Sequence, residues 1–372
     1  MQCIKIGVIG AGGVAQVEHI PNLVKLHRHF QVLGAFDPSQ KVRNFIGEEF
    51  GLNTCATLDE LLALPLDAVV IASPDPLHKE HILAALAKGL HVFCEKPLSY
   101  AVDDIDELIA ARDRAGRVLQ VGYMKRFDPS YEAALKMLPG SAATLRYVSV
   151  EVNDPDAWPF VRHYSTCRGD DVAAELIAST GAKQREQVGR AVAGLDDRDA
   201  YRGFTGAYSS SIVHDVNAVH GLLDALGVPD GEIVGASIFA GGQGGQGAVR
   251  LLGGQALWNM VHLAVPALAD YRERITLYFD DASLELEFPS PYLNHQPTRL
   301  TLRTSDGNTL SVRDIRIGYE EAFVEELKGF WSAIVEGKPV RNTAEHARRD
   351  MALLAGLARR HLATIKQSGA RP

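Results

Sequence analysis

The chain has 372 residues, a hydrophobic content of 46% and a formal net charge of −8 at pH 7. This length exceeds one ordinary hydrophobic core, so we expect two domains, and the apolar content excludes a largely disordered chain. Lysine and arginine are scattered through an acidic sequence, which argues against a nucleic-acid or membrane-binding surface and favours small-molecule chemistry.

The cysteines and the amino-terminal residues indicate a cellular compartment. Cys3, Cys55, Cys94 and Cys167 share no C-x-x-C spacing, and the first residues, MQCIKIGVIG, lack the basic head and long apolar run of a signal peptide. No apolar run approaches the roughly 20 residues that span a bilayer. We therefore expect a cytoplasmic protein with no membrane partner, no nucleic-acid partner and no metal site.

Residues 1–123 alternate short apolar runs with amphipathic stretches, two of which end at a glycine suited to a helix carboxyl terminus. The apolar runs have the length and composition of buried parallel strands and lie at 4–9, 32–36, 67–72, 91–94 and 118–122. This alternation predicts an α/β domain of the Rossmann type, in which helices cover both faces of a parallel sheet.

A glycine-rich turn follows the first predicted strand. Gly10, Gly12 and Ala15 form a G-x-G-x-x-A pattern directly before an apolar-periodic helix, and Asp37 follows the second strand. In this context the first glycine turns the chain, the second lets the backbone approach a pyrophosphate, and the acid accepts hydrogen bonds from a ribose. The pattern predicts a dinucleotide cofactor. The alternative is a plain strand-to-helix turn in which Asp37 only starts a turn before Pro38.

The charge at position 37 also bears on the choice of cofactor. A carboxylate there would repel a 2′-phosphate, and the nearby base Arg43 lies inside the next helical pattern. We therefore expect NAD, with NADP less favoured.

The fourth predicted strand runs directly into Glu95, Lys96 and Pro97 within the stretch HVFCEKPLSY. Strands of a doubly wound sheet end at the edge where ligands bind, so Lys96 would lie near the nicotinamide. A lysine in a dry pocket can hold a substrate oxygen and shift its proton affinity. The alternative for Lys96 is a solvated charge at the end of a strand.

After residue 123 the pattern changes to that of an α+β domain, which we place at 124–372. Strands of a large, mainly antiparallel open sheet are predicted at 143–152, 232–240, 255–265, 272–288 and 299–315. Asp306-Gly307 in the last stretch is a hairpin signal. Two helices follow, at 319–337 and 344–365.

Two segments fit this pattern less well. Residues 165–203 are polar and weakly helical, so we interpret them as a helical insertion. The run GGQGGQG at 241–247 is not followed by a helical pattern, so we interpret it as a flexible hairpin connection rather than a phosphate-binding loop.

Taken together, KIGVIGAGGVA, HVFCEKPL and GYMKRFDPSY resemble the Gfo/Idh/MocA oxidoreductase family, which uses NAD(P) to oxidise or reduce sugars, inositols and related polyols. The resemblance implies that Lys96 is catalytic or binds substrate, and that the Lys96–Pro97 bond is cis. It also implies a set of cofactor-contacting positions beside Gly10 and Asp37, namely Gly12, Gly13, Val14, Ala15, Ser73, Pro74, His78, Glu95, Lys96 and Met124.

The same resemblance implies substrate-side positions at Lys125, Arg126 and Asn153. For these residues an ordinary salt bridge or turn remains an equal alternative. The family's second signature, G-G-x-x-x-D-x-x-x-H-D-x-D, is matched at Gly206, His214 and Asp215, but Ser210 replaces the first Asp and Asn217 the last.

We interpret His214 as a catalytic acid–base, because imidazole titrates near neutral pH, and Ser210 as a substrate contact four residues earlier on the same helix face. The predicted activity is hydride transfer between NAD and a secondary alcohol or ketone of a sugar, cyclitol or sugar derivative. A catalytically silent NAD- or sugar-sensing regulator is the alternative, and a glycosidase working through transient NAD oxidation is a third possibility.

A homodimer or homotetramer is expected. The stretches ALWNMVHLAV and ITLYFDD are apolar on both alternations, which leaves the second face of the predicted sheet poorly suited to water. Relatives commonly associate through that face.

Overall fold

The computed structural model describes residues 2–195 and 197–368. These residues form two compact units whose segments alternate along the chain. Unit 1 contains residues 1–123, 161–191 and 323–349, and unit 2 contains 124–160, 192–322 and 350–372. Within the described parts of the chain, no helix has both the length and the apolar composition of a membrane span.

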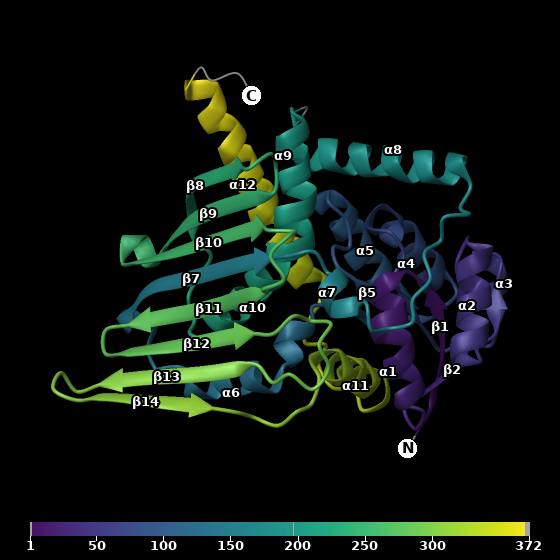
Figure 1. The fold of residues 1–372 in the computed structure, drawn as a ribbon, viewed down its shortest axis with the longest axis horizontal. Helices are drawn as coiled ribbons and strands as arrows, with labels where there is room; N and C mark the ends of the chain where they lie inside the picture. Colours follow the sequence, from purple (N-terminus) through teal and green to yellow (C-terminus); the bar gives the residue numbers. More distant parts are fainter. Residues whose placement is uncertain (1, 196, 369–372) are drawn as a thin grey trace. The chain divides into compact units, whose positions relative to one another are not determined.

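Unit 1 is built on a parallel sheet of six strands in the order β3-β2-β1-β4-β5-β6 (Figure 1). The strands are β1 (Ile4–Ile9), β2 (Phe30–Phe36), β3 (Thr54–Cys55), β4 (Ala68–Ile71), β5 (His91–Glu95) and β6 (Leu119–Gly122). Strand β1 pairs with β2 on one side and with β4 on the other, so the strand order reverses beside β1. In such sheets ligands bind at the carboxyl ends of the strands where this reversal occurs.

The helices of unit 1 follow the predicted alternation. They are α1 (Ile20–Lys25), α2 (Gln40–Phe50), α3 (Leu58–Leu62), α4 (His78–Ala87) and α5 (Val102–Ala115), joined from later in the chain by α8 (Ala174–Ala191) and α11 (Ala322–Val335). A core of side chains from β1, β5, α1, α2 and α11 includes Ile6, Phe93 and Phe330, each fully buried. The two predicted glycine ends are confirmed, because Gly89 and Gly116 have φ values of 72° and 60°.

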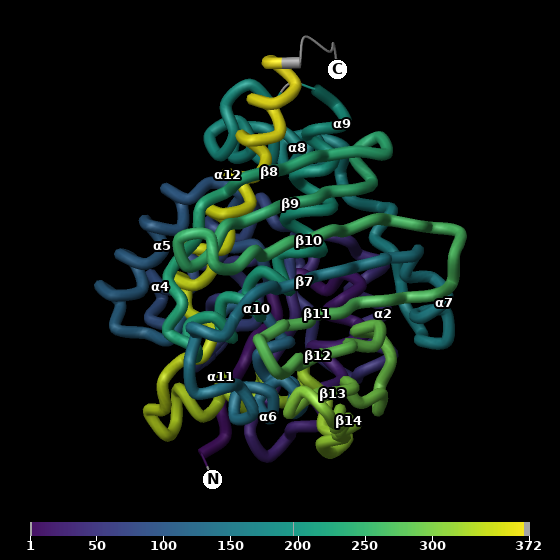
Figure 2. Tube along the Cα trace, turned by 90° about the vertical axis from the view of Figure 1, so that its left-hand side faces the viewer, coloured from purple at the N-terminus to yellow at the C-terminus, as the bar shows by residue number. Residues whose placement is uncertain are grey.

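Unit 2 is built on a sheet of eight strands in the order β14-β13-β12-β11-β7-β10-β9-β8, which Figure 2 shows stacked from β8 to β14. The strands are β7 (Leu145–Asp154), β8 (Glu232–Phe239), β9 (Gly244–Leu251), β10 (Ala256–Ala264), β11 (Arg272–Phe279), β12 (Ala282–Phe288), β13 (Arg299–Ser305) and β14 (Leu310–Ile315). All neighbours are antiparallel except β7 and β10. The predicted fold class is therefore confirmed.

The helices of unit 2 include α6 (Pro129–Met137), α7 (Trp158–Val161), α9 (Arg198–Gly203) and α10 (Val213–Ala225), which contains the signature residues His214 and Asp215. Helix α12 (Ala344–Ser368) begins in unit 1, and from Asp350 onward it belongs to unit 2. A π-helix, Phe204–Ile212, precedes α10 directly. The predicted Asp306-Gly307 hairpin joins β13 to β14, with Gly307 at a φ of 91°.

The glycine-rich run at 241–247 differs from the prediction. Only its first residues form the β8–β9 connection, because β9 begins at Gly244. The glycines in the strand are required by packing: a Cβ at Gly245 would lie 2.5 Å from the Tyr208 ring, and one at Gly247 would lie 2.7 Å from Leu357. Residues 241–243 therefore form the predicted hairpin connection, whereas residues 244–247 belong to the packed strand β9.

Candidate active site

The glycine-rich turn after β1 has the shape that a dinucleotide needs. Gly10 has a φ of 86°, and a Cβ at this position would lie 2.6 Å from the backbone of Ser73, so only glycine fits. A Cβ at Gly12 or Gly13 would meet no described atom within 4 Å. The backbone at these two glycines is thus open on the side where a pyrophosphate would approach.

Asp37 lies at the carboxyl end of β2 and holds this turn in place. Its Oδ2 accepts a hydrogen bond from the backbone N–H of Ala11 at 3.0 Å, and its Oδ1 accepts one from Ser39 at 2.9 Å. The guanidinium of Arg43 donates to the carbonyl oxygens of Asp37 and Pro38 at 2.8 and 3.0 Å. The nearby base is therefore engaged with the backbone of the turn.

Two histidines organise the loop that follows β4. One ring nitrogen of His78 lies 2.7 Å from the carbonyl oxygen of Ser73, and the other lies 2.8 Å from that of Pro97. His78 thus joins the loop after β4 to the loop after β5. The Ser73 hydroxyl lies 2.8 Å from Nδ1 of His81, whose burial lowers its pKa from 6.5 to about 4.

Behind the end of β5 lies a buried acidic cluster that the sequence did not suggest. Nε2 of His19 donates to Oε1 of Glu95 at 2.7 Å, and Glu326 from α11 completes the group. His19 and Glu326 are fully buried and Glu95 is 8% exposed.

The two carboxyl groups of this cluster differ in charge. Burial would raise the pKa of Glu95, but the hydrogen bond from His19 and the nearby positive charges outweigh it and hold the pKa below its usual value. Burial raises the pKa of Glu326 well above its usual value, and the charge of Glu95 adds to this effect. Glu95 is therefore ionised and Glu326 protonated at neutral pH.

This cluster is also the one group of described residues whose possible metal ligands lie within 4.8 Å of one another. Two carboxylates and an imidazole can bind a divalent cation only when all three are deprotonated. Nε2 of His19 and Oε1 of Glu95 already bind each other at 2.7 Å, and we interpret the group as the support of the residue that follows Glu95.

That residue is Lys96, which stands at the carboxyl edge of the sheet as predicted. Its backbone N–H donates to Oε2 of Glu95 at 3.3 Å, and the Lys96–Pro97 peptide bond is cis, which confirms the implied geometry. The buried carboxylate thus fixes the backbone from which the Lys96 side chain projects. The catalytic role of Lys96 stays a prediction.

In unit 2, Lys125 is the centre of a buried ion cluster. Its ammonium lies 3.2 Å from Oδ1 of Asp215 and contacts Oε1 of Glu273, while the Tyr271 hydroxyl donates to Glu273 at 2.9 Å. Burial would lower the pKa of Lys125, but the two carboxylates raise it. Burial together with the charge of Glu273 raises the pKa of Asp215 well above its usual value. The two carboxyl groups therefore share one ammonium, and burial favours the protonated form of Asp215.

Arg126, the next residue, supports helix α10. Its Nε and Nη2 donate to the carbonyl oxygen of Asn217 at 2.9 and 2.6 Å. The Asn217 side chain donates to Asp350 at 2.8 Å, and His220 lies 2.6 Å from the same carboxylate. Asn217, which departs from the family signature, therefore serves in a buried network within unit 2.

The remaining predicted residues lie in unit 2 at separate positions. His214 is half-buried near the start of α10, Ser210 is exposed in the preceding π-helix, Asn153 is half-buried on β7, and Met124 begins a short 3₁₀ turn. The π-helix has a wider turn than the α-helix on which the expected four-residue spacing of Ser210 and His214 was based. Their roles stay predictions.

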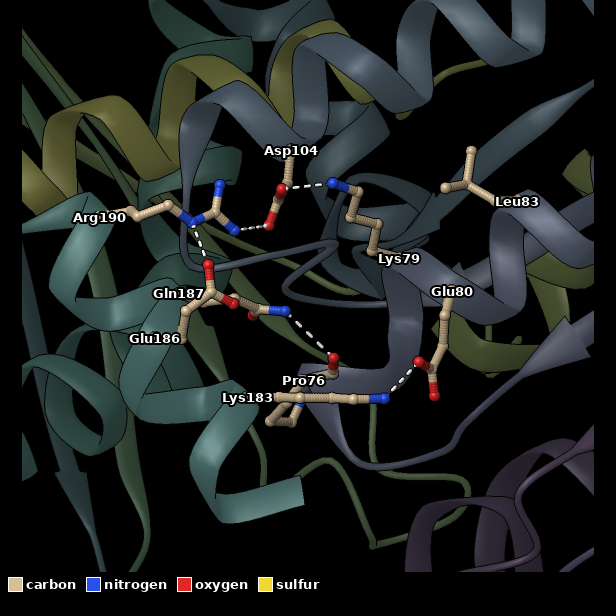
Figure 3. Close-up of a pocket in the computed structure, with 9 residues that line it drawn as sticks. All are labelled: Pro76, Lys79, Glu80, Leu83, Asp104, Lys183, Glu186, Gln187 and Arg190. Atoms are coloured by element: carbon tan, nitrogen blue, oxygen red, sulfur yellow. Dashed lines mark hydrogen bonds and ion pairs between the residues drawn. The ribbon is translucent and has the colours of Figure 1, made fainter. Parts of the chain in front are cut away.

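Unit 1 also contains a charged cavity of about 450 Å³ between α8 and helices α4 and α5 (Figure 3). Lys79 and Arg190 lie 2.6 and 2.7 Å from the two oxygens of Asp104, and Lys183 pairs with Glu80. Arg190 also pairs with Glu186 at 2.7 Å, so the three cations face three carboxylates and the cavity lining presents no net charge for a ligand. Its ion pairs instead fasten α8 to unit 1.

Comparison with known proteins supports the Rossmann fold of the first domain. Residues 4–123 match the model of the Gfo/Idh/MocA oxidoreductase family, described as an NAD-binding Rossmann fold. Inositol 2-dehydrogenase 3 from Saccharopolyspora erythraea is 34% identical over 130 residues, which cover 34% of this chain and 38% of that protein. An inositol 2-dehydrogenase/D-chiro-inositol 3-dehydrogenase from Shouchella clausii is 30% identical over 42% of this chain and 47% of its own length. The matches therefore span less than half of these curated relatives.

The likeness in fold extends over nearly the whole chain. UDP-N-acetylglucosamine 3-dehydrogenase from Acidithiobacillus ferrooxidans superposes with a TM-score of 0.70 at 19% identity, covering 97% of this chain and 99% of that one. A 3-ketoreductase from Actinomadura kijaniata in complex with NADP and TDP-benzene gives a TM-score of 0.68 at 19% identity, covering 96% and 97%. At this identity the likeness concerns the fold alone.

Proposed function

We propose that the chain, whose residues 4–123 match the model of the Gfo/Idh/MocA oxidoreductase family, transfers hydride between NAD and a secondary alcohol or ketone of a sugar, cyclitol or sugar derivative. The observation that carries the proposal lies in unit 1: the open glycine turn, Asp37 and Lys96 occupy the carboxyl edge of one parallel sheet. A ligand bound along this edge would meet all three.

The residues of the turn fit the cofactor by shape and by charge. The open backbone at Gly12 and Gly13 would face the pyrophosphate, and the Asp37 oxygens would accept hydrogen bonds from ribose hydroxyls. Each Asp37 oxygen accepts one backbone N–H and retains a further lone pair for this purpose. When bound, NAD supplies the hydride chemistry, while the protein supplies alignment and a dry pocket.

Lys96 would hold the substrate oxygen. A compact ammonium on a flexible stem can donate to that oxygen whether it belongs to an alcohol or a ketone. The backbone of Lys96 is anchored to Glu95, which itself accepts a hydrogen bond from His19, so the base of the Lys96 side chain is held in place. His214 would take the hydroxyl proton during oxidation and return it during reduction.

The predicted substrate-side residues are not equally suited to contact a substrate. We retain Asn153, Ser210 and Arg126 as candidate substrate contacts. For Lys125 the geometry favours the salt-bridge alternative, because its ammonium is committed to Asp215 and Glu273. No observation on the described residues favours a silent sensor, so that alternative is not carried further.

The test is a screen of sugars, inositols and their nucleotide or phosphate forms for NAD reduction, with the keto forms tested against NADH. On the best substrate, Lys96→Ala and His214→Ala should each lower kcat by about a hundredfold or more, which is the range of lost acid–base catalysis. NAD affinity should stay within about threefold. The exposed Lys88→Ala and His27→Ala serve as matched controls. Full activity in both alanine variants at positions 96 and 214 would reject this assignment of the chemistry.

Self-association is proposed on the sheet of unit 2. Tyr278 on β11 is 43% exposed and its ring lies 5.9 Å from that of Tyr147 on β7, so aromatic side chains gather on one face. An exposed aromatic face on an open sheet is a common site of contact between subunits. Light scattering at micromolar concentration should give the mass of a dimer or tetramer, and Tyr278→Asp should reduce it. A monomeric mass for the unaltered chain would reject the proposal.

A further inference from the structure

One segment from the middle of the chain packs on the nucleotide-binding edge of unit 1. We call residues 166–171, which precede α8, the strap. The backbone N–H of Cys167 donates to Oε1 of Gln16 at 2.7 Å, and Nε2 of Gln16 donates back to the carbonyl oxygen of Cys167 at 2.9 Å. The same nitrogen also donates to the carbonyl oxygen of Ala11 at 2.6 Å. A single buried amide therefore ties the strap to the glycine-rich turn.

The strap then reaches the turn that follows Asp37. At Gly169 the backbones come so close that an added Cβ would lie 2.8 Å from Cβ of Ser39. Two residues later, Oδ1 of Asp171 accepts a hydrogen bond from the Ser39 hydroxyl, and Oδ2 accepts one from the backbone N–H of Lys41 at 3.1 Å. Oδ1 of Asp170 lies 2.6 Å from the ammonium of Lys41.

These donors form a set that suits an anion. They comprise a hydroxyl, a backbone N–H in the first turn of the eleven-residue helix α2, and an ammonium. Helix amino termini and lysine side chains bind phosphate groups for the same electrostatic reason. Here the anion is supplied by the chain itself, because Asp170 and Asp171 occupy all three donors.

The position of this anion relative to Asp37 gives it a role. Ser39 donates its backbone N–H to Asp37 at 2.9 Å and its hydroxyl to Asp171, so it lies between the two carboxylates. If Asp37 takes the adenosine ribose, a phosphate on the 2′-oxygen would have to enter the same space beside Ser39. It would find the donors occupied and two further negative charges within reach.

We propose that Asp170 and Asp171 of the strap are specificity-determining residues that exclude NADP by occupying the donors a 2′-phosphate would need. The inference rests on the proposed function, since it takes the ribose of a bound NAD to lie at Asp37. It adds to the repulsion from Asp37 a second source of selectivity, contributed by a segment more than 120 residues later in the sequence. Both aspartates are exposed, so they can be changed without altering a core.

The test is Asp170→Asn/Asp171→Asn, titrated with NAD and NADP and with the fragments ADP and 2′,5′-ADP, which lack nicotinamide. The double variant should bind NADP and 2′,5′-ADP about tenfold or more tightly than the unaltered protein does. Its affinity for NAD and ADP should stay within about threefold. Glu48→Gln/Glu49→Gln, which removes two exposed charges from the other end of α2, is the matched control and should leave all four affinities unchanged.

The outcomes separate the two proposals. An unaltered protein that binds neither NAD nor ADP rejects the proposed function and this inference together. An unaltered protein that binds NAD, with a double variant whose NADP and 2′,5′-ADP affinities are unchanged, overturns the inference alone. If the double variant does not fold, Gly169→Ala provides a second test, because its Cβ must push the strap away from Ser39 and should likewise raise 2′,5′-ADP affinity.

Discussion

Replacing Lys125 by methionine is expected to destabilise the protein by removing the only cation of a buried cluster. The side chains of Lys125, Asp215 and Glu273 are 5%, 0% and 3% exposed, so water cannot take the place of the missing ammonium. Leaving a buried charge without its partner costs about 3–5 kcal/mol. We expect Lys125→Met to lower the free energy of unfolding by about that amount at pH 7.5.

The loss should depend on pH in a defined direction. Without the ammonium, the pKa of Asp215 loses the influence that lowers it and rises further, so the folded variant binds that proton more strongly. The unfolded state gives up that proton at a lower pH, and therefore the stability of the variant falls as pH rises. The variant should be closest to the unaltered protein at about pH 5 and furthest from it at about pH 8.

The measurement is urea unfolding from pH 5 to 8, followed by circular dichroism and by the fluorescence of Trp258, which is fully buried on β10. Lys125→Met/Glu273→Gln should recover most of the loss, because the neutral amide keeps an acceptor for Tyr271. Lys136→Met, at an exposed position of α6, is the control. A loss below about 1 kcal/mol, or one that does not vary with pH, would refute the account of the cluster.

Three further perturbations probe unit 1. Burial keeps a proton on Glu326 that the unfolded chain releases near pH 4.5, so the free energy of unfolding should fall as pH rises above that value. Glu326→Gln should remove this slope of about 1.4 kcal/mol per pH unit, whereas the control Glu325→Gln should leave it unchanged. The buried imidazole of His81 takes up a proton only near pH 4, whereas the unfolded imidazole takes one up at 6.5, so the free energy of unfolding should fall by about 3 kcal/mol as pH drops between these values. His81→Asn should flatten the accompanying decline in melting temperature. Gly10→Ala should lower the melting temperature and weaken NAD binding, whereas Gly12→Ala, whose Cβ meets no described atom, should weaken NAD binding alone in the same titration.

The sequence predicts unit 1 well because its signals are local. Continuous apolar runs mark strands buried on both faces, and glycines mark positions where φ must be positive, as at Gly10, Gly89 and Gly116. The missed strand β3 is only two residues long, too short to leave a pattern. The position of Lys96 at the edge of the sheet could be predicted because the residues that define this position are its immediate neighbours.

The buried side chains that contact Lys125 and Glu95 could not be predicted from local sequence patterns. Lys125 meets Glu273 across 148 positions of sequence, and no local pattern marks either residue as half of a pair. Glu326 reaches Glu95 from a helix whose apolar pattern indicates only a buried face. The run at 241–247 was predicted as a connection over its whole length, but residues 244–247 lie in β9, where Tyr208 and Leu357 from elsewhere in the chain leave no room for a Cβ at Gly245 and Gly247.

The strap shows how position in the sequence can differ from place in the structure. Residues 165–203 follow a strand of the second sheet, so the sequence suggested an insertion of that domain, yet residues 161–191 form a compact unit with the nucleotide-binding sheet. Their contacts explain why: Gln16 binds the backbone of Cys167, Ser39 binds Asp171, and the ion pairs of α8 bind α4 and α5. These contacts are polar, and α8 also buries the apolar side chains of Val188 and Ala191. Asp170 and Asp171 are exposed and contact unit 1 only through the hydrogen bonds and charges described above, so they can change without disturbing a core, and this makes them a suitable place for a protein to set the charge that its cofactor must match.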